Sequence, residues 1–178
     1  LYMIQFHCYP GGKKRVVTFS YDDGHPNDAR LIELFNRYGV KGTFHLNGAN
    51  YLGADEARRA DVRALYAGHE IACHTVHHGW LDKMPAASMI NELMQDRRIL
   101  EEIAEYPVVG MSYPCGAYSA EAENALRACG ILYSRTVRGT QGFGLPGDWL
   151  AWHPTSHHKT ALPLAEKFME TLDSEWFQ

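Results

Sequence analysis

The sequence has few cysteines, no long apolar run and no excess of basic residues. Four cysteines in 178 residues, without a CxxC pair, exclude a disulfide scaffold and a zinc ribbon and predict reduced thiols. No apolar run approaches the about 18 residues that a membrane-spanning helix needs. A net charge of −4, with a pI near 6.2, lacks the basic surface that nucleic-acid binding uses. We therefore expect no membrane span and no nucleic-acid partner.

The sequence predicts one globular domain over residues 1–178. Its length is enough to bury a core, and its 46% hydrophobic and 21% charged residues are ordinary for globular proteins. It contains no internal repeat and no low-complexity segment. No leader is evident, which favours a cytoplasmic location and leaves a secreted one open, because a leader can be removed. The sequence leaves the oligomeric state open.

Short apolar runs alternate with amphipathic stretches along the chain. We expect strands over residues 15–20, 41–46, 69–74, 108–113 and 131–136, and helices over 27–38, 54–67, 86–104, 119–129 and 162–172. This alternation predicts a parallel sheet of βαβ units, either open or closed into a barrel. Functional side chains should then follow the C-terminal ends of strands.

Two groups of polar residues stand directly after predicted strands. The pair Asp22 and Asp23 follows the first strand and precedes a glycine, a pattern that is also common in simple turns. The histidines His74 and His78 follow the third strand, and their i, i+4 spacing suits a shared metal. A surface cluster without a ligand is the alternative. His77 lies between them and should point elsewhere.

Two further groups follow later in the chain. The loop 112–118 after the fourth strand is either a plain connection or a pocket wall that presents a backbone N–H to an oxyanion. Tryptophans beside a pocket suit stacking on a sugar ring, although tryptophan is more often a core residue. We expect contacts to the substrate from Tyr113, Pro114, Trp149, Trp152 and His153.

Together these groups predict one catalytic metal site. One carboxylate and two imidazoles provide three protein ligands and leave positions open for water and substrate. The second acid of the pair is then free to act as a base, and a metal-bound water becomes a usable nucleophile near neutral pH. Zinc is the default metal for this ligand set, and cobalt, nickel, iron or manganese would also fit.

Three short motifs resemble those of the polysaccharide deacetylases that share the NodB homology domain, carbohydrate esterase family 4. The segment Thr18-Phe-Ser-Tyr-Asp-Asp-Gly24 resembles the first motif of that family, T-F-D-D-G. His74-Thr-Val-His-His78 matches the second, H-[ST]-x-x-H, and Tyr113-Pro-Cys-Gly116 resembles the third, R-x-P-Y-G. The resemblance covers most of the chain, from about Val16 onward.

The resemblance implies a distorted (β/α)7 barrel and a set of roles. Asp22 would be the catalytic base, Asp23, His74 and His78 the metal ligands, and the Cys115 N–H an oxyanion donor. Thr75 would help to hold the histidine loop. The implied activity is metal-dependent hydrolysis of an N- or O-acetyl group on a carbohydrate.

The sequence departs from the family pattern in three places. Ser112 stands where the third motif has an arginine that orients the base, and Cys115 stands at its aromatic position. The last motif, a strand that ends in L-x-H and carries a general acid, has no convincing copy. We expect the C-terminal strand of the barrel and this acid beyond Gln178. The alternative acids within the chain are His153, His157 and His158.

Two other functions stay open beside carbohydrate deacetylation. One is an amidohydrolase for a small cyclic amide, a reaction whose enzymes on this fold tend to alter the metal residues, which are intact here. The other is a sugar- or metal-binding module that has lost activity, because the arginine and the last histidine are missing. The acetylated substrate is left open among chitin fragments, peptidoglycan, exopolysaccharide and acetylxylan.

Overall fold

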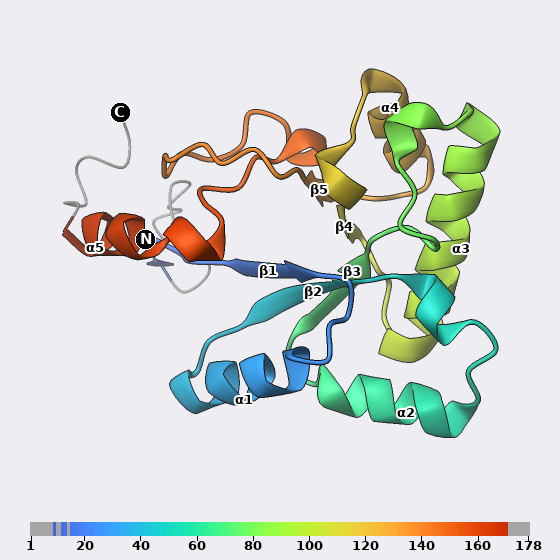
Figure 1. Ribbon diagram of the computed structural model, residues 1–178, viewed down its shortest axis with the longest axis horizontal. Coiled ribbons are helices and arrows are strands. Elements are labelled where there is room, and N and C mark those ends of the chain that lie inside the picture. Colours follow the sequence, from blue (N-terminus) through green and yellow to red (C-terminus); the bar gives the residue numbers. More distant parts are fainter. Residues whose placement is uncertain (1–8, 10–11, 14, 171–178) are drawn as a thin grey trace, which may run out of the picture.

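The structure is a computed structural model that describes residues 9, 12–13 and 15–170. Its centre is a parallel sheet in the order β1-β2-β3-β4-β5, in which every strand pairs with its neighbour in the sequence (Figure 1). The strands are β1 (Phe19–Asp22), β2 (Gly42–Leu46), β3 (Glu70–Cys73), β4 (Gly110–Ser112) and β5 (Tyr133–Arg135). The sheet curls in one direction without closing, so the fold is an incomplete (β/α) barrel. The predicted barrel of parallel strands is confirmed in this form.

Each connection between strands contains one helix, as a parallel sheet requires. The helices are α1 (Asp28–Tyr38), α2 (Glu56–Leu65), α3 (Ala86–Ala104), α4 (Ala120–Ala128) and, after β5, α5 (Leu162–Glu170). Local signals set several helix ends. The Asp55 side chain caps α2 and the Ser119 side chain caps α4, while α1 ends at Gly39 in the left-handed conformation, with φ 66°.

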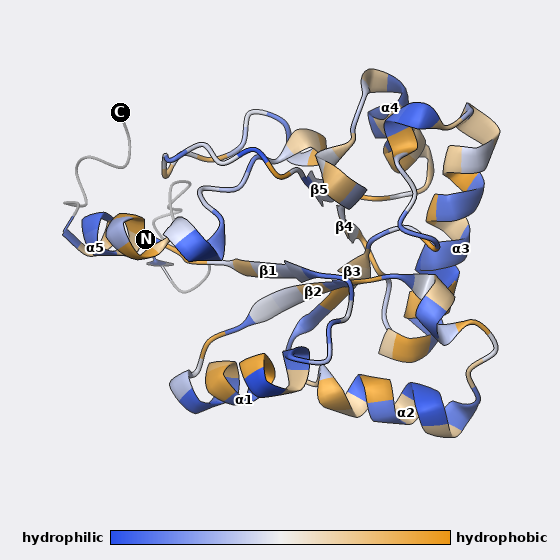
Figure 2. Ribbon diagram, in the orientation of Figure 1, coloured by the Kyte–Doolittle hydropathy of each residue, from blue (hydrophilic) through white to orange (hydrophobic). Residues whose placement is uncertain are grey.

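The core lies between the sheet and the helices. Phe44 and Leu46 of β2 point to one face of the sheet and His45 to the other, and all three are buried, so both faces of this strand are covered. Helix α3 contributes Leu93, Leu100 and Ile103 from one stripe and contacts α2, α4 and β3. In Figure 2, helices α1 to α4 each mix hydrophilic and hydrophobic segments, the colouring of helices with one buried face. This packing fixes where each strand ends.

The register of the sheet brings the C-terminal ends of the strands to one edge. Asp22 at the end of β1 pairs with His45 of β2, and Ser112 at the end of β4 pairs with Arg135 at the end of β5. The end of β2 pairs with Cys73, the residue before His74. The polar residues after these strands therefore share one edge of the barrel.

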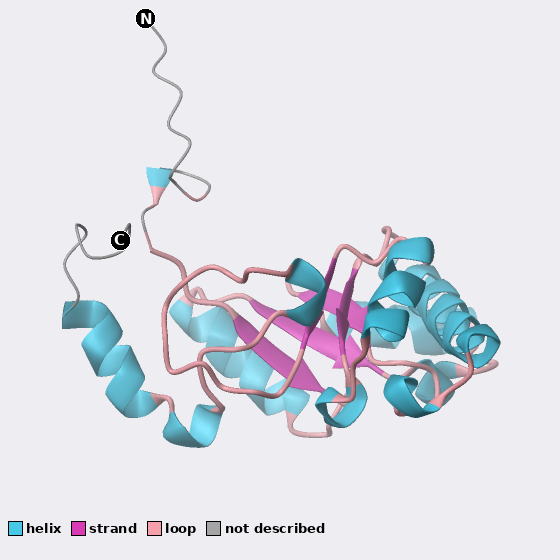
Figure 3. Ribbon diagram, turned by 90° about the horizontal axis from the view of Figure 1, so that it is seen from above, coloured by secondary structure: helices cyan, strands magenta, loops and turns pink. Residues whose placement is uncertain are grey.

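The segment between β5 and α5 extends the curl beyond β5. Trp152 pairs in parallel with Arg135: its N–H donates to the Ser134 carbonyl at 2.9 Å, and its carbonyl accepts from the Thr136 N–H at 2.8 Å. The segment then passes over the side of β1 opposite to α1 (Figures 1 and 3). The His158 ring stacks on Tyr21 with centroids 6.0 Å apart, and the Tyr21 ring also contacts Phe35 of α1.

The first strand differs from the prediction over residues 15–20. Pairing with β2 begins at Phe19 and includes Asp22, while Val16 and Val17 are 47% and 55% exposed. The β-branched run therefore precedes the pairing, and the strand extends into the first motif. Three of the four cysteines, Cys73, Cys115 and Cys129, are free thiols, and Cys8 lies outside the described residues. Among the described helices, none has the length and hydrophobicity of a membrane span.

Leu100→Ala tests how far α3 supports the barrel. The Leu100 side chain is fully buried, so we expect the substitution to lower the free energy of unfolding by about 2–5 kcal/mol through lost burial and a cavity. Leu132→Ala, at a side chain that is 66% exposed, is the matched control and should change stability by less than about 0.5 kcal/mol. Urea denaturation measures both. Equal losses in the two variants would contradict the packing described here.

Candidate metal centre and catalytic base

Three side chains from two strand-end loops converge at the C-terminal edge of the barrel. Asp23 follows β1, while His74 and His78 follow β3. Asp23 Oδ1 lies 3.5 Å from His74 Nε2 and 3.6 Å from His78 Nε2, and the three donor atoms lie within 4.8 Å of one another. Ligands at about 2.1 Å from a tetrahedral zinc ion are about 3.4 Å apart, so this set has the size of a metal site.

The ring of His74 is held with Nε2 free for a metal. Its Nδ1 lies 2.8 Å from the Ser112 carbonyl oxygen. Because a carbonyl only accepts, Nδ1 carries the proton and Nε2 carries the lone pair. His74 is 2% exposed, and burial lowers its pKa, which favours the neutral ring that a metal requires. His78 is more open to solvent, and its ring packs edge-on against that of His74.

Four non-glycine residues at this edge have left-handed backbone conformations. They are Asp23 (φ 76°), Thr75 (φ 62°), His78 (φ 55°) and Cys115 (φ 54°). Such conformations cost of order 1–3 kcal/mol each and persist only where surrounding contacts impose them. Strain of this kind concentrates at functional sites. Here the strained residues are the candidate ligands Asp23 and His78, Thr75 in the histidine loop, and the candidate oxyanion donor Cys115.

Buried hydrogen bonds hold the histidine loop in this conformation. The fully buried Asp96 of α3 accepts from the His74 N–H at 2.9 Å and from the Gly48 N–H at 2.7 Å. Burial raises the pKa of Asp96 to about 7. The Asn47 amide donates to the carbonyl oxygens of His74 and Thr75 at 2.8 and 3.1 Å. The backbone of His74 is therefore fixed on both sides, and Thr75 Oγ1 closes the loop by accepting from the Gly79 N–H at 2.9 Å.

Asp22 is held between two donors from the far side of the barrel. Its Oδ1 accepts from Ser112 Oγ at 2.9 Å and from the guanidinium of Arg135. Burial raises the pKa of Asp22, but the positive charge of Arg135, with smaller contributions from the His45 and His74 rings, outweighs burial and lowers the pKa to about 2. Asp22 is therefore a carboxylate at neutral pH, with its orientation fixed beside the metal ligands.

Arg135 is itself positioned by a buried chain of hydrogen bonds. Its Nε donates to Ser20 Oγ at 2.8 Å, and Ser20 Oγ lies 2.9 Å from His45 Nε2. His45 Nδ1 lies 3.2 Å from the Cys73 carbonyl and is the donor there. Burial lowers the pKa of His45 to about 3, so the ring is neutral and Nε2 accepts from Ser20. Arg135 lies outside the three motifs and was not among the predicted site residues, although it ends a strand as Asp22 does.

The loop after β4 offers the candidate site a backbone N–H group and not the side chains that were predicted. The Cys115 N–H has no hydrogen-bond partner among the residues that the structure describes, so it is available as a donor. Pro114 is buried, and Tyr113 is 1% exposed and donates its hydroxyl to the Leu150 carbonyl at 2.8 Å. The expectation that Tyr113 and Pro114 contact substrate through their side chains is therefore corrected, because both side chains are packed inside.

The predicted aromatic and histidine contacts lie apart from the metal ligands. Trp149, which is 48% exposed, packs on Trp152 with ring centroids 5.4 Å apart. His153 Nδ1 lies 2.6 Å from Thr136 Oγ1, and its ring packs edge-on against Tyr118. No described contact joins Trp149, Trp152 or His153 to Asp22 or to the metal ligands. The His158 ring stacks on Tyr21, and the His157 ring packs against that of His158.

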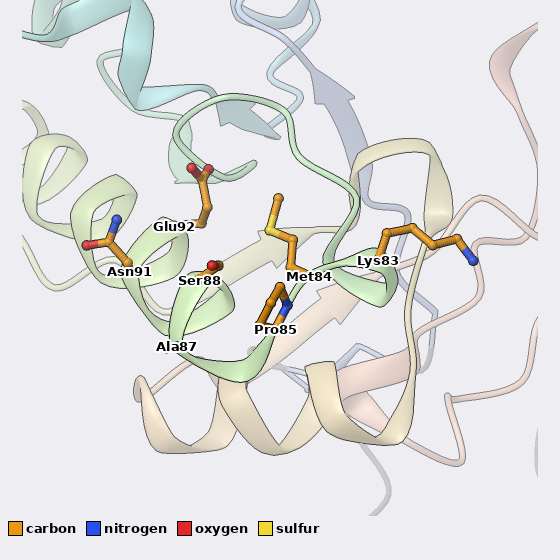
Figure 4. Close-up of a pocket in the computed structure, with 7 residues that line it drawn as sticks. All are labelled: Lys83, Met84, Pro85, Ala87, Ser88, Asn91 and Glu92. Atoms are coloured by element: carbon orange, nitrogen blue, oxygen red, sulfur yellow. The ribbon is translucent and has the colours of Figure 1, made fainter.

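His77 is directed toward α3. Its N–H and Nδ1 contact the two carboxylate oxygens of Glu92 at 3.0 and 2.7 Å. Glu92 also lines a pocket of about 500 Å³ at the beginning of α3, beside Met84 and Ser88 (Figure 4). His77 thus belongs to the surface beside the metal loop and anchors that loop to α3.

Comparison with known proteins agrees with this geometry. The family model described as "Polysaccharide deacetylase" matches residues 10–134. A probable peptidoglycan-N-acetylglucosamine deacetylase of Arthroderma benhamiae is 32% identical over 109 residues, which are 60% of this chain and 25% of that protein. A chitin deacetylase of Colletotrichum lindemuthianum is 21% identical over 92% of this chain and 76% of its own length. This chain spans between a quarter and a third of the first two curated relatives that it matches.

Solved structures share the fold. The Streptococcus pyogenes deacetylase PplD, in complex with acetate, superposes with a TM-score of 0.72 at 18% identity, over 91% of this chain and 71% of that one. A Bacillus cereus polysaccharide deacetylase superposes with a TM-score of 0.68 over 83% of this chain and 49% of that one. The predicted resemblance of the chain to the polysaccharide deacetylases is thus confirmed. Since the family model covers well over half of its length, the chain belongs to the polysaccharide deacetylase family, which shares the NodB homology domain.

Proposed function

We propose that the chain removes acetyl groups from an N- or O-acetylated carbohydrate in a metal-dependent hydrolysis. The observation that carries the proposal is Asp22, a carboxylate fixed by Arg135 and Ser112 beside the donor set of Asp23, His74 and His78. A base next to an open three-ligand site is the arrangement for activating water. Relatives described as a probable peptidoglycan-N-acetylglucosamine deacetylase, a chitin deacetylase and a bifunctional xylanase/deacetylase support an acetylated polysaccharide as the substrate.

Asp23, His74 and His78 would hold one divalent metal, with zinc as the first choice for one carboxylate and two imidazoles. Such a metal would polarise the acetyl carbonyl and would lower the pKa of a bound water to near 7, which a base as weak as Asp22 needs. The separations between the donor atoms and the orientation of His74 Nε2 support this choice of ligands.

The residues of the chain supply proton transfer and charge stabilisation. Asp22 takes a proton from the attacking water, while Arg135 and Ser112 keep its carboxylate oriented. The unpartnered N–H of Cys115 donates to the oxyanion of the tetrahedral intermediate. The proton on Asp22 is then available to the leaving amine or alkoxide, and acetate is released.

Acetate release tests the proposed activity. We expect the zinc-loaded chain to free acetate from acetylated chitin oligosaccharides, peptidoglycan fragments or acetylxylan, and to stop when a chelator removes the metal. Asp22→Asn should lower kcat by roughly 100-fold or more, because the base is lost. A chain that binds zinc and frees no acetate from any of these substrates would instead be a binding module.

Asp23→Asn separates the metal ligand from the base. An amide is a poorer ligand than a carboxylate, so we expect zinc affinity to fall by roughly 100-fold or more, beyond the about 10–100-fold loss that follows from changing an outer partner of a ligand. Asp22→Asn is the matched control and should retain zinc. Metal content by mass spectrometry, with competition against a chromogenic chelator, checks both. Full zinc occupancy in Asp23→Asn would refute the assigned ligand set.

Arg135→Met tests the residue that holds the base. Removing the guanidinium leaves Asp22 without its main positive partner, so we expect kcat to fall by roughly 100-fold with a smaller change in KM. Arg135→Lys keeps the charge without the planar fork and should recover part of the rate. Arg37→Met, at an exposed arginine that pairs with Glu33, is the control for loss of an arginine. Steady-state rates of acetate release measure these effects. A fully active Arg135→Met variant would contradict the proposal that Arg135 positions Asp22.

A further inference from the structure

The side chain of Met84 packs on the histidine loop directly beyond the candidate ligand His78. A Cβ built on Gly79 would overlap the Met84 methyl group, so this methyl lies against the backbone of Gly79 itself. The Gly79 N–H donates to Thr75 Oγ1 at 2.9 Å, which ties the loop back on itself. Met84 therefore covers the point where the histidine loop is closed.

The thioether of Met84 is also within reach of small molecules from solvent. Met84 is half-buried, and it lines the open pocket of about 500 Å³ at the beginning of α3 together with Ser88 and Glu92 (Figure 4). On its inner side Met84 packs against the hydrophobic core. The same side chain thus has an apolar contact with a ligand loop and an opening to solvent.

A thioether in this position is a site for oxidation to the sulfoxide. With hydrogen peroxide as the oxidant, Met84 Sδ gains one oxygen atom as the O–O bond breaks, and the second oxygen leaves as water with both protons. The sulfoxide replaces an apolar group by a polar one that needs hydrogen-bond donors. The Gly79 N–H already donates to Thr75, so the sulfoxide oxygen must turn toward the pocket and draw the side chain off the loop.

We propose that Met84 is an oxidation site that controls metal binding, because its sulfoxide releases the His78 side of the histidine loop. His78 directly precedes Gly79 and has φ 55°, a conformation that persists only where surrounding contacts impose it. His74 is held separately by the buried Asp96. This inference rests on the ligand set of the proposed function and adds to it a chemical modification that lowers activity.

Two substitutions at Met84 test the contact without an oxidant. Met84→Gln has an unbranched side chain with a polar end, as the sulfoxide has, and we expect it to lower zinc affinity roughly tenfold or more. Met84→Leu keeps an apolar side chain of similar volume and should bind zinc as the native chain does. Met169→Gln, at a methionine that is 73% exposed on α5, is the matched control. Competition against a chromogenic chelator measures affinity, and circular dichroism checks that each variant is folded.

Peroxide treatment tests the modification itself. The metal-free native chain is exposed to hydrogen peroxide and then to dithiothreitol, which reduces reversibly oxidised thiols such as the exposed Cys115 and leaves sulfoxides in place. We expect mass spectrometry to find oxygen on Met84 before the buried Met89 and Met111, and zinc affinity to fall roughly tenfold. Methionine sulfoxide reductases should restore the affinity, and Met84→Leu should keep it throughout.

The outcomes separate this proposal from the proposed activity. If Met84→Gln and the oxidised native chain bind zinc as tightly as the untreated chain, Met84 does not control the site. The proposal also fails if peroxide weakens zinc binding by Met84→Leu as much as by the native chain, because another residue is then responsible. If oxidation of Met84 lowers zinc affinity while the untreated chain frees no acetate, the oxidation site stands and the deacetylase function fails.

Discussion

The contact between Arg135 and Asp22 joins the two edges of an open barrel. β1 and β5 are the first and last strands of the sheet, and no backbone ladder connects them among the described residues. The guanidinium spans this gap, donating to Asp22 at the end of β1 and to Ser20 within it. Their side chains are 14% and 29% exposed, so removing either partner leaves a largely buried charge. One ion pair therefore supports the curl of the sheet and fixes the charge and orientation of Asp22, the candidate catalytic base.

The three candidate metal ligands could be predicted because their signal is local. Asp23, His74 and His78 stand directly after strands, and two of them share an i, i+4 spacing within one loop. The rule that side chains at the C-terminal ends of parallel strands meet needs no tertiary information. The boundaries of α3 also follow from apolar periodicity alone. Strand β1 begins later in the chain than predicted, because pairing with β2, and not the presence of β-branched residues, decides where a strand begins.

The contacts that hold the candidate ligands and Asp22 in place could not be predicted from the sequence in this way. Arg135 lies 113 residues from Asp22, and their contact depends on the curvature of the whole sheet. From the sequence, Asp96 is one polar position of a long amphipathic helix. In the structure it is fully buried, and it binds the backbone of the two loops that contain Gly48 and His74. Tyr113 sits in a motif associated with substrate and is packed against Leu150. In each case the partner comes from a distant element, so residue type and spacing carry no information about it.

The strained backbone explains why so much buried hydrogen bonding surrounds so small a site. Four left-handed residues at roughly 1–3 kcal/mol each would together rival the stability of a domain if nothing opposed them. Asp96 and Asn47 hold His74 and the strained Thr75 that follows it through buried hydrogen bonds, and the Thr75 hydroxyl ties the loop at Gly79. The strain is thus supported by the fold and not by a ligand. A metal bound by this donor set would therefore have little of the loop to order, and little of its binding free energy would be lost to ordering.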